Sequence, residues 1–99
     1  MTALEVLRTI RERLLRLGWQ QFHYGNDHGP NCIIGAINHE AALASAGAVF
    51  TLMRALIAVV VVDDSASIIS WNDERDRTLA DVLDALDWAE SLLMSEAQS

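Results

Sequence analysis

The chain has 99 residues and one cysteine, a length at which a single domain is the rule, so we expect residues 1–99 to form one compact domain. Hydrophobic residues make up 52% and charged residues 21%, which is too apolar for a disordered chain. The formal net charge of -7 disfavours binding to nucleic acids and to anionic membranes, because both require clustered cations. One cysteine forms no internal disulfide, and no signal-peptide pattern follows Met1, so we expect a cytoplasmic protein.

The first segment is predicted to be a helix. Thr2 and Glu5 have the spacing of a capping box, and Gly18 stands where a helix commonly ends. Apolar residues at three- and four-residue intervals supply an inner stripe: Leu4, Leu7, Ile10, Leu14 and Leu17.

The arginines of this segment hold four of the seven cations of the chain: Arg8, Arg11, Arg13 and Arg16. We expect them to form a solvated face, paired with Glu5 and Glu12 or with the acidic C-terminal region. A basic docking surface is the alternative.

The helical period is lost between Trp19 and Ile34. The aromatic residues Trp19, Phe22 and Tyr24 precede a turn-rich run at 25–30, and two short strands, 21–24 and 31–33, would flank it. The sequence therefore predicts a β-hairpin near residues 21–33. Such a hairpin must pack on helices to be stable.

Two apolar helices are predicted next, over about 35–46 and from about 48 to 59 or beyond, and we expect them to form the core. Residues 41–62 contain one charge, Arg54, and their length would suit a membrane span. Arg54 near the middle and interruptions at Ser45 and Gly47 favour a buried core helix instead. The valines at 59–62 would either extend this helix or form a short strand.

The C-terminal third begins with a turn at 63–65, followed by a short helix over about 67–72. Thr78 and Asp81 repeat the capping-box spacing and open a last helix that runs to about Met94. The expected fold is mostly α with a minor β-hairpin: about four helices around an Ala/Val/Leu core.

Several short elements in order carry a resemblance to a known family. They are Gly18-Trp19, the run Cys32 to Ile37, Trp71-Asn72-Asp73, and Arg77-Thr78. Their pattern resembles the family called domain of unknown function 6197, found in actinobacteria and their phages, over nearly the whole chain. The matched positions are Trp19, Gln21, Cys32, Gly35, Ala36, Trp71, Asn72, Asp73, Arg77 and Thr78.

The resemblance implies no activity, substrate or cofactor. A cysteine frequent in the family just after the first tryptophan is Gln20 here, which argues against a disulfide or a thiolate-metal role for Cys32. Gln21 matches the family's glutamine, and its place beside Trp19 suggests a side chain that binds backbone groups.

Cys32 is the sharpest catalytic candidate, because a thiol just before a helix start experiences the positive end of the helix dipole. Candidate bases are His23, His28 and His39. Asp73 or Asn72 would orient the base, as a nucleophilic dyad requires. The structural interpretation, which we favour, is a buried Cys32 packed on Gly35 and Trp71.

A zinc site is a weaker alternative, because four nitrogen and sulfur ligands fall within sixteen residues but match no standard spacing. These residues are His23, His28, Cys32 and His39. We therefore expect no metal and no cofactor.

The Trp71–Thr78 segment is expected to be structural. Trp71 would lock the short helix on the core, Asn72 and Asp73 would bind turn backbone groups, and Arg77 would pair with Asp73 or Asp81. The functional alternative is a ligand or partner pocket built from Trp71, Asn72 and Cys32.

The last helix carries acids at three-residue intervals, and such runs are usually solvated faces. The residues are Asp81, Asp84, Asp87 and Glu90. We consider them the candidate partner-binding residues, because an acidic strip would attract a basic protein surface or mimic nucleic-acid phosphates.

The first functional hypothesis is a non-enzymatic protein that binds another protein through this acidic surface, as a phage or prophage modulator of a host process. The alternative is a cysteine-dependent hydrolase or transferase using Cys32 and a histidine, with His39 and Asp73 as further candidates. A third class is a self-assembling protein, such as a homodimer, with an apolar patch around Trp88 and Leu92.

Overall fold

The computed structural model describes residues 1–98. Within them lie five α-helices, four of them eight residues or longer, and one short 3₁₀ helix. The α-helices are α1 (Ala3–Leu17), α2 (Ile33–Glu40), α3 (Ala46–Val62), α4 (Ile68–Asn72) and α5 (Leu79–Gln98), and the 3₁₀ helix is η1 (Ala41–Leu43). The prediction of a mostly helical fold is confirmed.

The two long outer helices begin at the caps that the sequence predicted. The Thr2 hydroxyl accepts the Glu5 N–H at 3.1 Å, and the Glu5 carboxylate accepts the Thr2 N–H at 3.0 Å. Thr78 and Asp81 make the same reciprocal pair at the start of α5, at 3.0 and 3.2 Å. Each box satisfies two backbone donors that a helix start leaves without partners.

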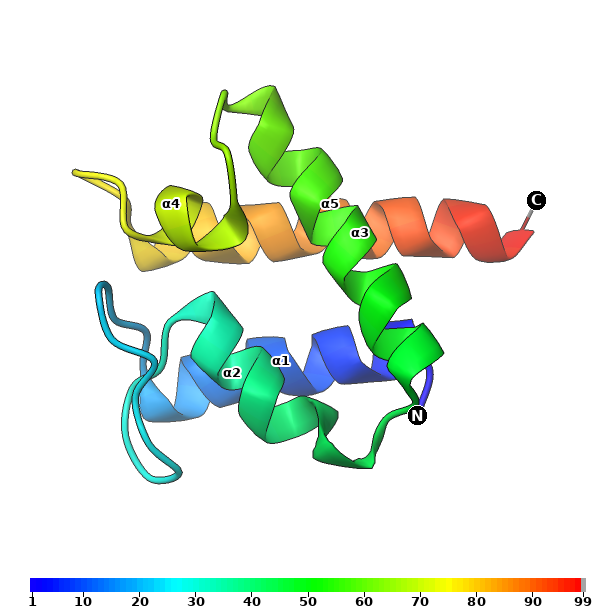
Figure 1. The fold of residues 1–99 in the computed structure, drawn as a ribbon, viewed down its shortest axis with the longest axis horizontal. Coiled ribbons are helices and arrows are strands. Elements are labelled where there is room, and N and C mark those ends of the chain that lie inside the picture. Colours follow the sequence, from blue (N-terminus) through cyan, green and yellow to red (C-terminus); the bar gives the residue numbers. More distant parts are fainter. Residues whose placement is uncertain (99) are drawn as a thin grey trace.

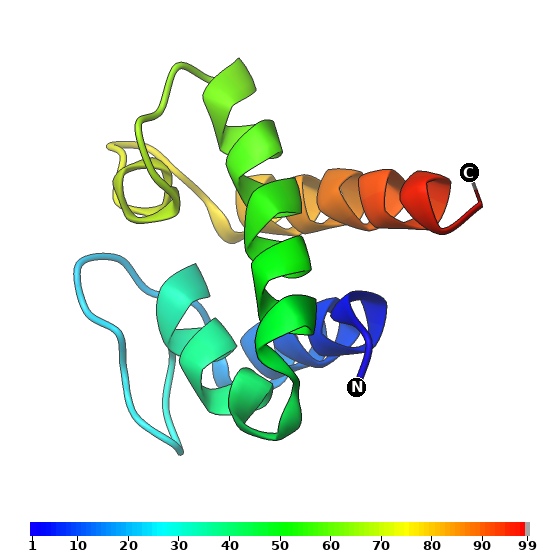
Figure 2. The ribbon, with the colours of Figure 1, turned by 45° about the vertical axis from the view of Figure 1, so that its right-hand side comes forward.

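The helices form two layers. In Figure 1, α1 and α5 run antiparallel, α3 crosses in front of both, and α2 and α4 lie at one end. Figure 2 agrees with this arrangement, since α3 again stands in front of α1 and α5. Helix α3 packs against both of these helices, and α1 also packs against α2 and α5. All five α-helices supply buried side chains to one cluster, with Leu7, Ile10, Leu52, Trp71 and Leu86 among the largest.

The predicted β-hairpin is wrong. In place of strands, the described chain has two isolated bridges, Trp19 with Asn31 and Gly25 with Asn31. Phe22 and Gly25 have φ angles of 72° and 86°, which turn the chain out of an extended path. Side chains from other elements bind the backbone of this segment, so no strand ladder is needed to satisfy it. We call residues 18–32 the long loop.

The middle helices differ from their predicted bounds. Helix α2 begins at Ile33 because the Cys32 sulfur accepts the Gly35 N–H at 3.3 Å and so caps the helix. It ends at Glu40, where η1 begins. Helix α3 begins earlier than expected, after the Ser45 cap, and continues through all four valines. No helix of residues 1–98 is long and apolar enough to cross a membrane.

Candidate functional site

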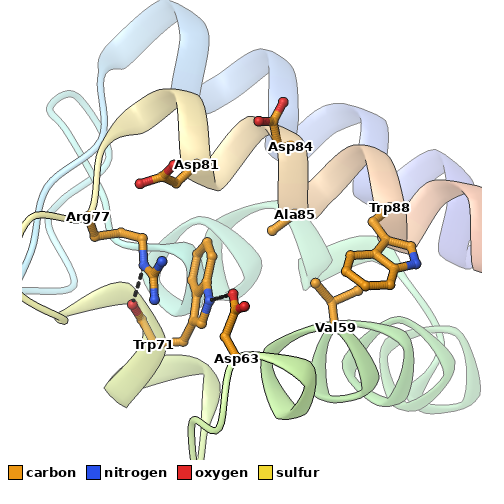
Figure 3. A pocket seen from close by; sticks show the side chains of 8 residues that line it. All are labelled: Val59, Asp63, Trp71, Arg77, Asp81, Asp84, Ala85 and Trp88. Atoms are coloured by element: carbon orange, nitrogen blue, oxygen red, sulfur yellow. Dashed lines mark hydrogen bonds between the residues drawn. The ribbon is translucent and has the colours of Figure 1, made fainter.

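A groove between the end of α3, α4 and the first half of α5 gathers acids and tryptophans (Figure 3). Its volume is about 180 Å³. The lining residues are Val59, Asp63, Trp71, Arg77, Asp81, Asp84, Ala85 and Trp88. We call it the acidic groove, since three carboxylates and one guanidinium line it.

One wall of the acidic groove is rigid. The Trp71 side chain is 2% exposed, and its indole N–H donates to the Asp63 carboxylate at 2.8 Å. The Arg77 guanidinium stacks 3.9 Å from the centre of the Trp71 ring and donates to the Trp71 carbonyl at 2.9 Å. Arg77 also pairs with Glu74 at 3.0 Å, and not with Asp73 or Asp81 as expected. The cation of this wall is therefore already occupied.

The opposite wall belongs to α5 and is open to solvent. Asp81 is held by its capping box, whereas the exposed Asp84 has no cationic partner among the residues the structure describes. Trp88 follows Asp84 by one helical turn and is 47% exposed. Figure 3 shows the Asp84 and Trp88 side chains on the same helix beside the groove. This wall thus carries one carboxylate and one exposed indole, which extend from different sides of α5 in Figure 3.

The four acids of the predicted strip lie in two different places. Three residues turn an α-helix through about 300°, so each acid is displaced by about 60° from the one before. Asp81 and Asp84 line the acidic groove, whereas Asp87 pairs with Arg11 and Glu90 with Arg8 at 3.1 Å. The expected pairing of the arginines with the acidic C-terminal region is confirmed for Arg8 and Arg11. The role of the strip in partner binding stays a prediction.

The family motif residues meet on the other side of α4, with Asn72 at the centre. The Asn72 side-chain oxygen accepts the indole N–H of Trp19 at 2.8 Å and the backbone N–H of Ile33 at 3.1 Å. Its amide nitrogen donates to the Gln20 carbonyl at 3.2 Å. Asn72 is buried, and both its side-chain oxygen and its side-chain nitrogen form hydrogen bonds. These bonds attach both ends of the long loop to α4.

Two more motif residues strengthen this attachment. The Gln21 side chain donates to the carbonyls of Asn72 and Glu74 at 3.0 and 2.7 Å, in agreement with its expected role. The Asp73 carboxylate accepts the Phe22 N–H at 2.8 Å, which holds this exposed aromatic residue at a positive φ. These polar motif residues thus hold the long loop against α4 and the turn that follows it.

Position 35 requires glycine because two backbone segments approach closely there. A Cβ built on Gly35 would lie 1.9 Å from the Tyr24 carbonyl oxygen. Ala36 beside it has no exposed surface. The first turn of α2 therefore packs directly on the backbone of the long loop.

Cys32 lies in the wall of a second hollow of about 330 Å³, lined by Phe22, His23, Tyr24, Cys32, Ile69 and Asp73. Of the proposed catalytic residues, Cys32 and Asp73 are brought together here with His23. His39 pairs with Asp27 at 2.8 Å and does not line this hollow. Cys32 is 5% exposed, and its sulfur already caps α2.

The zinc alternative finds no support in the geometry. Within residues 1–98 no three His, Cys, Asp or Glu side chains are grouped so that they could hold a metal ion. The proposed ligands His23, His28, Cys32 and His39 therefore do not form a cluster.

Arg13 is buried and does not lie on the solvated face that the sequence predicts. Arg13 is 8% exposed and donates to the Asn31 side chain at 2.6 Å and to the carbonyls of Asn26 and Asp27. It also pairs with Glu40 at 3.2 Å. The available signal was its spacing, because Arg13 follows Ile10 by three residues and so lies beside the inner stripe.

The apolar patch predicted around Trp88 and Leu92 is divided. Trp88 is exposed, whereas Leu92 is half-buried and packs against the core. Trp88 therefore belongs to the acidic groove and not to a separate apolar surface.

Comparison with known proteins yields one match. The sequence profile of the family described as "Family of unknown function (DUF6197)" matches residues 1–92. No curated protein and no solved structure matches the chain. The match covers all the motif residues that carry the resemblance.

Proposed function

Because the chain belongs to a family of unknown function (DUF6197), we propose a function from its own geometry: it binds another protein and is not an enzyme. In this proposal the acidic groove receives a basic segment of the partner. The chain acts in the cytoplasm, as a phage or prophage modulator of a host process.

The observation that carries the proposal is that Asp84 and Trp88, one helical turn apart on α5, line the same groove. A guanidinium group binds well between a carboxylate and the face of an indole, which combines an ion pair with a cation–π contact. The chain contains this arrangement once already, where Arg77 stacks on Trp71 and pairs with Glu74. Asp84 and Trp88 offer the same two groups, one turn apart, without a cation from the described chain.

The charge of the surroundings supports a cationic ligand. Asp63 and Asp81 lie in the same groove, and the whole chain has a net charge of -7. The field of these acids attracts a basic segment and raises the rate at which it associates.

The test is a titration of the full chain with a short unstructured peptide that contains two arginines separated by glycines. Binding of every variant is followed by tryptophan fluorescence at the same salt concentration, about 0.15 M. We expect Asp84→Lys to weaken the affinity by about tenfold or more, because attraction becomes repulsion beside the bound guanidinium. Trp88→Ala should weaken it by about threefold, the value of an exposed cation–π contact.

The matched control is Glu12→Lys, which makes the same change of charge at an exposed acid of α1, outside the groove. It should leave the affinity within about twofold of the original at 0.15 M salt, where the screening length is about 8 Å. Asp87→Lys is not suitable, because Asp87 pairs with Arg11 between α5 and α1. Equal losses for Glu12→Lys and Asp84→Lys would contradict a specific groove and leave only the effect of net charge.

One observation favours the cysteine-dependent alternative, namely that Cys32 and His23 line the same hollow. Its test is the rate at which iodoacetamide alkylates the folded chain. An enzyme that uses this pair requires rapid alkylation at neutral pH that His23→Ala slows. Alkylation at the rate of an ordinary buried thiol in both chains would end this alternative.

A further inference from the structure

The hollow beside Cys32 lies where the long loop meets α4, at one end of the molecule (Figure 1). Its lining is mainly apolar, since Phe22 and Tyr24 of the long loop and Ile69 of α4 contribute to it together with Cys32. A volume of about 330 Å³ and an apolar lining with few polar groups are typical of pockets for small molecules. We call it the aromatic hollow, and its ligand must be sought among small organic molecules.

The two aromatic residues are exposed although the fold holds their backbone in place. Phe22 and Tyr24 are 69% and 56% exposed. The Phe22 N–H nevertheless donates to the Asp73 carboxylate at 2.8 Å, at a φ of 72°, and the Tyr24 carbonyl accepts the Asn31 side chain at 2.9 Å. A positive φ at a residue with a side chain persists only where its surroundings impose it, and such positions are frequent at ligand sites. Exposed rings on a fixed backbone form a binding surface that is already ordered before the ligand arrives.

The charge of the aromatic hollow is negative. Among the described residues that line it, Asp73 is the one carboxylate, His23 is the other polar side chain, and there is no arginine. The Oδ1 atom of Asp73 accepts the Phe22 N–H and the side-chain amide of Asn72, at 2.8 and 2.9 Å. Its Oδ2 atom forms no hydrogen bond or ion pair with the described chain. One carboxylate oxygen beside two exposed rings favours a cation, as does the net charge of -7.

We propose that the aromatic hollow binds a small organic cation with a quaternary ammonium group. The faces of aromatic rings attract such a group, and it needs no hydrogen-bond acceptor because it has no N–H. A guanidinium group binds a carboxylate best through both oxygens, and at Asp73 one of them already accepts two hydrogen bonds. The hollow therefore selects a different cation from the acidic groove, and this inference does not depend on the proposed function.

The test is a proton NMR titration of the full chain with choline chloride, which replaces sodium chloride at constant ionic strength and at about pH 8, where imidazole groups are neutral. Tyr24 is the one tyrosine of the chain, so its ring protons report on the hollow directly. We expect them to shift with a dissociation constant of about 1 mM or lower. The neutral isostere 3,3-dimethylbutan-1-ol has the shape of choline without its charge and should bind at least about tenfold more weakly.

Two variants separate the contributions of the charge and of a ring, with circular dichroism to show that each is folded. Asp73→Asn keeps an oxygen that accepts the Phe22 N–H but removes the charge, and it should weaken choline binding by about fivefold. Phe22→Leu keeps an apolar side chain but removes the ring, and it should weaken binding by about threefold. The matched control is Asp76→Asn, the same change at an exposed acid outside the hollow, which should stay within about twofold of the original. Position 76 has a φ of 69°, which asparagine tolerates.

Three results would overturn the proposal. The first is that the Tyr24 signals do not move at about 10 mM choline, ten times the expected dissociation constant. The second is that 3,3-dimethylbutan-1-ol binds as tightly as choline, which would show a merely apolar pocket. The third is that Asp73→Asn and Asp76→Asn weaken binding equally, which would leave only the effect of net charge. The comparison of the two ligands uses the original chain, so it decides the matter even if a variant does not fold.

Discussion

The two sides of α4 differ in how their polar groups are used. On the side of the long loop, the side chains of Asn72, Gln21 and Asp73 form hydrogen bonds with other parts of the chain. On the side of the acidic groove, Asp84 has no cationic partner in residues 1–98 and Trp88 is exposed. Groups that are fully bonded within the fold stabilise it, whereas exposed groups of complementary chemistry are available to a ligand. The structural motif and the proposed binding surface therefore lie on opposite sides of one short helix.

The two tryptophans of the acidic groove give the largest expected contrast. Trp71→Ala removes a buried aromatic side chain and should lower the free energy of unfolding by about 3 to 5 kcal/mol. Trp88→Ala removes an exposed one and should change it by no more than about 0.5 kcal/mol. Urea denaturation measures both. Similar losses for the two variants would contradict the division into a structural and a binding wall.

Two glycines, one packed against the long loop and one in open space on α3, should respond oppositely to substitution by alanine. Gly35→Ala should cost about 2 kcal/mol or more, because the new Cβ would clash with the Tyr24 carbonyl and force the backbones apart. Gly47→Ala, in the first turn of α3 where the nearest atom is 3.9 Å away, should raise stability by up to about 1 kcal/mol. Thermal denaturation would refute the close packing if both variants shifted the melting temperature in the same direction.

Cys32 is expected to show a smaller effect, set by its cap. Cys32→Ala removes the acceptor for the Gly35 N–H and should cost about 1 kcal/mol. Cys32→Ser retains an acceptor at this position and should cost less than Cys32→Ala. The comparison is made by chemical denaturation, and a larger loss for the serine variant would show that the cap is not the main contribution of Cys32.

The smallest expected effect is that of pH on the first capping box. Hydrogen bonds from the backbone and side chain of Thr2 lower the pKa of Glu5. A carboxyl whose pKa is lower in the folded chain stabilises it above the unfolded value, near 4.3, and loses this contribution as the pH falls through the folded value. Glu5→Gln should therefore slightly reduce the acid sensitivity of helix content below pH 4.3, measured by circular dichroism. An unchanged acid profile would contradict the contribution of this box.

Local chemistry made part of the fold predictable. The capping boxes at Thr2 and Thr78 involve residues three apart, so the sequence alone locates the starts of α1 and α5. The structure of the long loop could not be predicted, because the groups that bind it are distant in the sequence. Asn72 lies about fifty residues from the Trp19 and Gln20 groups that it binds. A strand pattern within the loop carries no information about such partners.

The candidate site was predictable only in part. Their charge and spacing indicate Asp81 and Asp84, whereas Asp63 and Trp71 join them only through tertiary packing. Acids three residues apart are displaced around the helix axis, and this displacement alone predicts that Asp87 and Glu90 face away from the groove. Burial of Arg13 could be read from its place beside the inner stripe, although its bonding partners in the long loop could not.

The central claim, that the acidic groove and not the motif side binds the ligand, is tested most directly by the three indole N–H signals in a nitrogen-15 NMR spectrum of the full chain. The ligand is the two-arginine peptide described above. We predict that the Trp88 signal shifts most on titration, that Trp71, bonded to Asp63, shifts less, and that Trp19, bonded to Asn72, does not move. A titration in which Trp19 shifts most, or in which no indole signal moves, would contradict the account.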